Sequence, residues 1–319
     1  MRKLIALILS VALLLCCVPA MAEEAAPVKT GLSMITNMTN AKQTNINLTA
    51  VTVDENGVIT ACVIDYIQAK VAVDETGVIT TEKGFNFLSK HEKLDDYGMR
   101  PVSSISKEWF EQAQAFAAYC VGKTVEEVKG IALNEGGYPV DADLAAGCTM
   151  KVTEYIAGVE DAVAKAEYIG AKKGDVLKLT QVTVLDKAVN ATAEKNGNFQ
   201  VYGHAAAITL NGETITSCVI DAVQAAANFD ATGALTSDIS AEFLTKIEKG
   251  DAYGMRPASA ISKEWFEQAA AFCAYVTGKT LTEATGIAIN EGGYPTDADL
   301  TAGCTMKVKS MIELIEKAK

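Results

Sequence analysis

Apolar and polar residues alternate along 46–53 and again along 58–67, and the turn Asp54-Glu55-Asn56-Gly57 separates the two segments. Alternation with a period of two predicts strands, and an Asn-Gly pair between strands predicts a tight hairpin. We expect a shorter hairpin at 70–81. Residues 26–46, rich in Thr, Asn and Gln, are interpreted as an opening strand followed by a loose loop.

A helical period replaces this alternation further along the chain. Residues 85–94 are predicted to form a helix whose charged face is solvated. Trp109 and Phe116 belong to a set of apolar positions at helical spacing, which predicts a second helix. We expect Ser106 to cap that helix and Gly122 to end it.

Two further helices complete the pattern. Thr124 and Glu127 have the spacing of a capping box, which predicts a short helix. After a loop at 134–139, Thr149 is expected to begin a helix that runs to Val163. The predicted fold class is therefore α+β, an antiparallel sheet with helices packed on it.

The chain contains this unit twice, at an offset of 156 residues. Residues 58–152 align with 214–308 without a gap; 15 of 17 positions are identical between 97–113 and 253–269, and 20 of 23 between 130–152 and 286–308. A period this long indicates a duplicated domain rather than a solenoid. We therefore expect two tandem copies of the α+β unit, at 23–171 and 172–319.

Residues 1–22 have the pattern of a secretory signal peptide. Arg2 and Lys3 precede an apolar run at 4–18, and Ala20-Met21-Ala22 is a small-x-small cleavage site. We expect a secreted or extracytoplasmic protein associated with the cell envelope, with no transmembrane segment in the mature chain. Lipid anchoring through the leader cysteines is left open.

The chain is acidic, with a net charge of −12 that becomes −14 when Arg2 and Lys3 leave with the leader. This charge argues against nucleic acid and anionic membranes as partners. Six cysteines remain, without a CxxC motif or a His/Cys cluster, so a zinc site is not expected. Cys62 matches Cys218 and Cys148 matches Cys304, whereas the other two do not match and are expected outside any repeated site. The disulfide state is open for Cys62, Cys120, Cys148, Cys218, Cys273 and Cys304.

The main candidate site is a loop that ends in Gly-Cys-Thr in both repeats. If a helix opens directly after it, backbone N–H groups and the helix dipole could bind a phosphate there. The alternative is a plain helix entrance, with the Asp as a loop cap, the Gly in a turn and the Thr as N-cap. The residues are Asp143, Gly147, Cys148 and Thr149, and in the second copy Asp299, Gly303, Cys304 and Thr305.

This loop resembles the C-terminal motif of the FMN-binding domain family, extracytoplasmic domains that carry covalently attached FMN. The family motif is Asp, two variable residues, Ser/Thr, Gly, Ala and Ser/Thr; here Ala146 and Cys148, with their copies Ala302 and Cys304, depart from it. The resemblance implies FMN attached through its phosphate to Thr149 and Thr305 by a flavin transferase.

A second candidate surface is a loop of Tyr, Gly, Met and Arg before the Trp-containing helix. The Tyr and Met could face a flavin ring and the Arg could pair with a phosphate. The alternative is a structural turn in which Tyr and Met fill the core and Arg binds a carboxylate. The residues are Tyr97, Met99 and Arg100, and Tyr253, Met255 and Arg256.

Other positions carry weaker signals. Trp109 and Trp265 are expected to pack in the core rather than stack on a ligand. Asp141 and Asp143 form a D-x-D, a weak metal-binding pattern. No nucleophile, His and acid arrangement is duplicated, so the sequence gives no support for hydrolase chemistry.

Two functions follow as expectations. The resemblance implies an exported electron carrier that passes electrons to an extracytoplasmic redox partner and has no substrate of its own. An acidic surface would suit a basic partner. The alternative is a non-enzymatic extracellular binding or surface module that keeps the fold without flavin.

Overall fold

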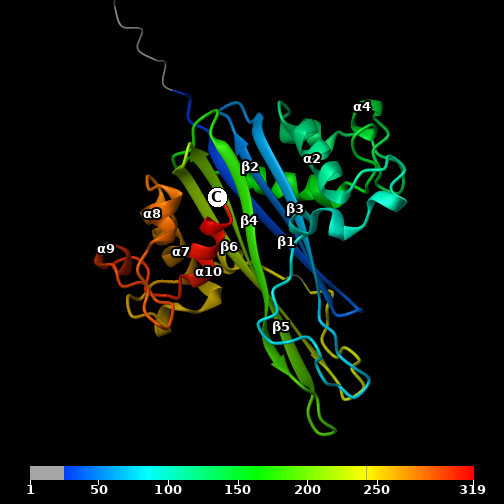
Figure 1. Ribbon diagram of the computed structural model, residues 1–319, viewed down its shortest axis with the longest axis vertical. Helices are drawn as coiled ribbons and strands as arrows, with labels where there is room; N and C mark the ends of the chain where they lie inside the picture. Colours follow the sequence, from blue (N-terminus) through cyan, green and yellow to red (C-terminus); the bar gives the residue numbers. More distant parts are fainter. Residues whose placement is uncertain (1–24, 242) are drawn as a thin grey trace, which may run out of the picture.

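The computed structural model describes residues 25–241 and 243–319, and within them each repeat forms one three-stranded antiparallel sheet (Figure 1). The first sheet has the order β1-β2-β3 and the second the order β4-β5-β6, so the predicted α+β fold in two copies is confirmed. The strands are β1 (Lys29–Thr39), β2 (Gln43–Val53), β3 (Ile59–Lys70), β4 (Val176–Val189), β5 (Gly197–Asn211) and β6 (Thr214–Phe229).

The hairpin predicted at Asn56-Gly57 joins β2 to β3, with Gly57 at a φ of 78° that favours glycine. The prediction of a loose loop before residue 46 is wrong. β1 pairs with β2 along its whole length, from Lys29 opposite Val53 to Thr39 opposite Gln43. Asn47 and Thr49, the polar positions of the alternation in β2, are buried against α5 and do not face solvent.

The two sheets pack against each other through their inner faces. Ile46 and Leu48 of β2 belong to the same buried cluster as Val201 and Ala205 of β5. A Cβ on Gly203 would lie 2.6 Å from Cδ1 of Ile46, so the sheets meet closely at this glycine. One hydrophobic core is thus shared by both repeats.

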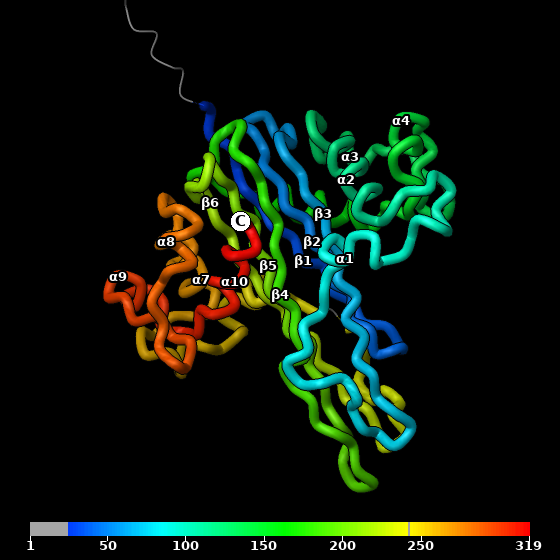
Figure 2. The backbone as a smooth tube through the Cα atoms, viewed as in Figure 1, coloured from blue at the N-terminus to red at the C-terminus, as the bar shows by residue number. Residues whose placement is uncertain are grey.

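Helices cover the two outer faces. α2 (Trp109–Cys120) and α5 (Thr153–Ala164) pack on the first sheet, and α7 (Trp265–Val276) and α10 (Lys309–Glu316) pack on the second. Figure 2 shows the helices of the two repeats on opposite sides of the strands. The short helices are α1 (Lys90–Lys93), α3 (Val125–Lys129), α4 (Ala142–Ala145), α6 (Lys246–Lys249), α8 (Leu281–Thr285) and α9 (Ala298–Thr301).

Several predicted element limits are wrong for local reasons. α2 begins at Trp109 with Glu108 as N-cap, because Ser106 has a φ of 51° and lies in the preceding turn. The helix end predicted at Gly122 is confirmed, because Val121 is the C-cap of α2 and Gly122 follows it at a φ of 85°. The capping box of Thr124 and Glu127 at α3 is also confirmed. α5 begins at Thr153, four residues after Thr149, so Thr149 does not start a helix.

The predicted helix at 85–94 is mostly absent. Its first residues instead run beside the second sheet: Gly84 donates to the Leu185 carbonyl at 2.8 Å and Phe87 to the Thr183 carbonyl at 2.8 Å. Only α1 and a 3-10 turn, Leu94–Tyr97, follow. The short hairpin predicted at 70–81 is present: Val73 bridges Ile79, and the N–H groups of Asp74 and Thr80 donate to the carbonyls of Val78 and Ala72, each at 2.9 Å.

No helix within the described residues is both long and apolar enough to cross a membrane. The expected signal peptide, residues 1–22, lies outside the described residues.

Candidate functional site at the first turns of α2 and α7

The first turn of α2 fixes the Tyr97–Arg100 loop through a buried carboxylate. Glu108 is 2% exposed and accepts hydrogen bonds from the N–H groups of Met99, at 2.9 Å, and Arg100, at 2.7 Å. In the second repeat Glu264 accepts the same pair from Met255 and Arg256, at 2.8 and 2.7 Å. This loop is therefore placed by the helix in both repeats.

The arginine of this loop is bound to carboxylates. Arg100 contacts Asp95 at 2.7 Å and Glu111 at 2.9 Å, and Arg256 contacts Asp251 and Glu267 at 2.8 and 2.9 Å. These ion pairs, with the burial of the Tyr and Met against the core clusters, match the structural alternative for this loop.

One turn further along α2, a buried glutamine fixes the other loop. The Gln112 Oε1 accepts the N–H of Thr149 at 2.8 Å and its hydroxyl at 3.2 Å. Its Nε2 donates to the Ser103 hydroxyl at 3.0 Å and to the Lys107 carbonyl at 3.2 Å. Glu108 and Gln112 thus bring both sequence-predicted loops onto one helix, which sequence reasoning did not anticipate.

The second repeat repeats this geometry. Gln268 accepts the Thr305 N–H at 2.8 Å and its hydroxyl at 3.4 Å. Both threonines are partly exposed, and the Ser104 hydroxyl lies 3.4 Å from that of Thr149. The two threonine hydroxyls are therefore held in the same orientation and can be reached from solvent.

The glycine of the motif is explained by packing. A Cβ on Gly147 would lie 2.7 Å from the Ala115 Cβ of α2, and one on Gly303 would lie 2.7 Å from that of Ala271. Such contacts are closer than side chains tolerate, so the glycine lets the loop approach the helix. This reason differs from both the phosphate-binding role and the simple turn role predicted for it.

The remaining motif residues divide into buried and exposed ones. Cys148 and Cys304 are fully buried, whereas Asp143 and Asp299 are exposed in the first turns of α4 and α9. Asp141 caps α4 by accepting the Leu144 N–H at 3.0 Å. Across residues 25–241 and 243–319, no group of three or more His, Cys, Asp or Glu side chains is placed to hold a metal ion.

A buried lysine lies under the Tyr97 loop. Lys90 is 8% exposed, and its Nζ lies 4.5 Å from the ring centroid of Tyr66, 4.8 Å from that of Tyr97 and 5.2 Å from that of Trp109. Cation–π attraction offsets part of the cost of burying the charge. The prediction of a solvated charged face is wrong for this residue.

The second repeat builds a similar aromatic box around Lys246, in which Tyr202 of β5 takes the place of Tyr66 of β3. Its Nζ lies 4.5 Å from the centroid of Tyr202, 4.6 Å from that of Tyr253 and 5.0 Å from that of Trp265. Burial is the main cause that lowers the pKa of both lysines to about 8. The protein's own ammonium fills each box, so this is an internal element rather than a site for an external cation.

The cysteines meet in a pattern that the alignment hides. Cys62 of β3 and Cys120 of α2 pack in one core cluster, as do Cys218 of β6 and Cys273 of α7, and all four are free thiols in the structure. Cys120 and Cys273 therefore do belong to a repeated arrangement, and the expectation that they lie outside one is wrong.

A cavity of about 610 Å³ lies between the repeats. Its walls come from the β1 region and the end of α5 on one side and from β6 and α7 on the other. Asp221 is the buried carboxylate on its wall; burial raises the pKa of this group to about 6. Lining residues include Leu32, Lys165, Ile220, Asp221, Phe266 and Ala270.

Comparison with known proteins adds one short similarity. The chain is 46% identical over 46 residues to a protein named "Chlorophenol reductase" from Desulfitobacterium hafniense, and the match spans 14% of this chain and 14% of that protein. No family model and no solved structure matches the chain.

Proposed function

We propose that this protein is an exported electron carrier that holds one FMN per repeat, attached through the flavin phosphate to Thr149 and Thr305. The observation that carries the proposal is the pair of accessible threonine hydroxyls, each held by a buried glutamine in the same geometry. The resemblance of the loop to the FMN-binding domain family suggests the ligand.

The residues around Thr149 fit a phosphoester. Gln112 accepts both the amide and the hydroxyl hydrogen of Thr149, so the amide hydrogen bond can remain when the hydroxyl hydrogen is replaced. Lys151 follows the threonine by two residues, and Lys107, just before α2, is close enough to Cys148 for its charge to counter part of the rise that burial causes in the pKa of that thiol. They match Lys307 and Lys263 in the second repeat. These cations favour phosphate on an otherwise acidic protein.

Bound FMN would supply the redox chemistry, and the chain would supply position and electrostatics. Tyr97 and Met99 pack toward the core, so they would hold their loop in place rather than face the flavin ring. A flavin transferase and an extracytoplasmic redox partner are the implied partners. The short similarity to a protein named as a reductase agrees with a redox setting.

The test is the intact mass and visible spectrum of protein exported from a host with a flavin transferase. We expect a mass gain of two FMN units and flavin absorbance near about 450 nm. Thr149→Val with Thr305→Val should abolish both, whereas Thr149→Ser with Thr305→Ser, which keeps the hydroxyls, should retain them. Folded wild-type protein of unmodified mass would overturn the proposal; circular dichroism establishes folding.

The cavity between the repeats favours a second candidate, a binding module for a small apolar molecule. Its volume and largely apolar walls are typical of ligand sites. Ala270→Gln introduces the residue that the first repeat has at the equivalent position, Gln114, and would narrow the cavity. A colourless protein whose melting temperature rises with apolar compounds, but not in this variant, would favour the binding module over the carrier.

A further inference from the structure

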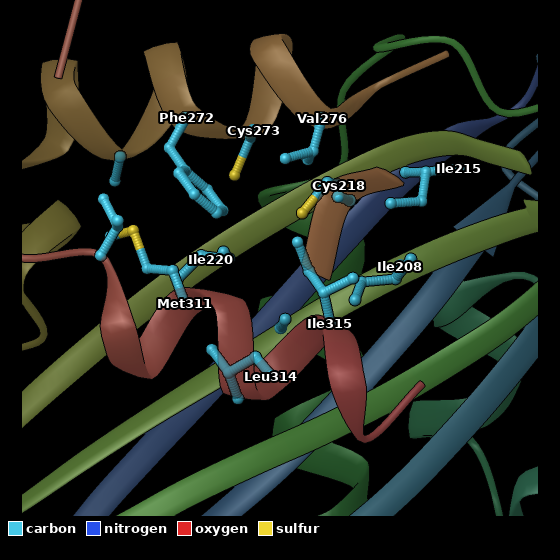
Figure 3. Packing of buried hydrophobic residues seen from close by; sticks show 14 of the residues in the cluster. Ile208, Ile215, Cys218, Ile220, Phe272, Cys273, Val276, Met311, Leu314 and Ile315 are labelled. Atoms are coloured by element: carbon cyan, nitrogen blue, oxygen red, sulfur yellow. The ribbon is translucent and has the colours of Figure 1, made fainter. Parts of the chain in front are cut away.

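Each repeat brings one strand cysteine and one helix cysteine together in the core. Cys62, which is partly buried, and Cys120 pack in one cluster between β3 and α2, and Cys218 and Cys273 pack in another between β6 and α7. All four are free thiols in the structure. Figure 3 shows Cys273 extending from α7 toward the strand that carries Cys218, among Phe272, Val276 and Ile220. Cys120 is fully buried, and Cys218 and Cys273 are 4% and 7% exposed.

The helix cysteines do not occupy equivalent positions. Cys120 aligns with Val276, and Cys273 aligns with Ala117. The two positions are three residues apart, so they lie on the same face of the helix one turn from each other. Each repeat therefore has a helix thiol near its strand cysteine, but the two repeats use different helix positions for it. Elsewhere in 58–152 and 214–308 the two sequences align without such a shift.

The thiols are unsuited to reactive redox chemistry. The hydrogen bond with the partner thiol and then burial raise the pKa of Cys62 and of Cys218 well above the usual value. Reactive cysteines have lowered pKa values and exposed thiolates. A pair of this kind, in a chain whose first residues predict export, is suited to a structural cross-link.

We propose that Cys62 with Cys120, and Cys218 with Cys273, form disulfides after export. In each pair two S–H bonds break and one S–S bond forms, and two electrons and two protons pass to the disulfide of an exported thiol oxidoreductase, which becomes a dithiol. Each bridge ties the helix that carries Glu108 and Gln112, or their copies, to the sheet. The proposal is independent of flavin attachment.

The third cysteine of each repeat provides the internal control. Cys120 lies close enough to Cys148 to raise the pKa of the Cys148 thiol, and Cys273 has the same effect on Cys304. Neither Cys148 nor Cys304 is hydrogen-bonded to a cysteine. Because each strand cysteine packs with the helix cysteine of its own repeat, we expect Cys148 and Cys304 to remain thiols.

The test is thiol alkylation of the full chain, exported into an oxidising compartment and unfolded without reductant. We expect two alkylated positions, Cys148 and Cys304, and six after reduction, with non-reduced peptide maps that link 62 to 120 and 218 to 273. Six alkylated cysteines without reductant, or a link from 120 to 148, would overturn the proposal.

A relocation variant tests the geometric argument. Cys120→Ala combined with Ala117→Cys moves the helix thiol to the position used by the second repeat. The expected map links 62 to 117, whereas Cys120→Ala alone should leave Cys62 alkylated. Failure of the double variant to cross-link while its second-repeat bridge is intact would show that the two positions are not interchangeable.

Discussion

Lys165, at the end of α5, lies 2.7 Å from Glu248 of α6, and this ion pair joins the two repeats. A reciprocal pair joins them in the other direction, with Lys317 at the end of α10 lying 2.6 Å from Glu92 of α1. Glu92 and Glu248 are equivalent, but Lys317 aligns with Asp161, one helical turn before Lys165. Each repeat thus contributes one glutamate and one lysine to these ion pairs, but the two lysines do not occupy equivalent sequence positions.

These pairs predict a loss of stability in acid. For both Glu92 and Glu248 burial acts most strongly and raises the pKa, but the hydrogen bonds they accept, including that from the lysine, outweigh it, so the net pKa is lowered. A carboxylate with a lowered folded-state pKa stabilises the protein above its unfolded pKa, and this stabilisation is lost as pH falls through the folded value. Glu92→Gln with Glu248→Gln should cost about 0.5–1 kcal/mol per pair at pH 7.

Urea unfolding at pH 7 and at pH 3 measures this effect. The double variant should show a smaller difference between the two pH values than the wild type. Glu160→Gln is the matched control, because its pair with Lys129 lies within the first repeat and is more exposed. Equal effects of control and double variant would argue against a role for the pairs between repeats.

The buried lysines predict a gain of stability in alkali. Burial lowers the pKa of Lys90 and Lys246 to about 8, so above this pH the folded state loses protons that the unfolded state still binds. Stability contributed by these groups therefore rises with pH from about 8 to about 10, by up to about 3 kcal/mol per lysine. Lys90→Met with Lys246→Met should remove that rise.

The measurement is the free energy of unfolding at pH 7, 8.5 and 10. Lys93→Met with Lys249→Met, in the same short helices but outside the aromatic boxes, controls for the loss of two charges. An unchanged pH profile in the Lys90/Lys246 variant would contradict the assignment of the alkaline rise to these residues.

The close approach of Gly147 to Ala115 predicts a coupled pair. Gly147→Ala should destabilise the protein by about 1–3 kcal/mol, because its methyl group would overlap that of Ala115. Ala115→Gly alone should cost about 1 kcal/mol through helix propensity. The double variant should be more stable than the sum of the two single effects predicts, as measured by urea unfolding; strict additivity would refute the contact.

Sequence reasoning predicted the parts of the fold that local chemistry determines. Asn56-Gly57 predicts its hairpin because few residues adopt the positive φ that the turn requires, and Thr124 with Glu127 predicts α3 because the two side chains cap the helix within four residues. The duplicated unit followed from near-identical segments. Each of these signals lies within a short stretch of chain.

The errors concern residues whose state depends on distant parts of the chain. Lys90 has the sequence surroundings of a solvated charge, and only the rings of Tyr66 and Trp109 show why it is buried. Cys120 and Cys273 looked unrelated because a gapless alignment compares positions, not helix faces. Thr149 looked like a helix start, but Gln112 binds its N–H and holds it outside α5.

The shared core between the sheets also has a consequence for association. Ile46 and Leu48 of one repeat are covered by Val201 and Ala205 of the other, so each repeat supplies the apolar surface that its neighbour needs. The short connection between α5 and β4 turns this pairing into an intramolecular event with a high effective concentration. The association of the two repeats with each other is therefore independent of protein concentration, in contrast to a pair of separate repeats held together only by mass action.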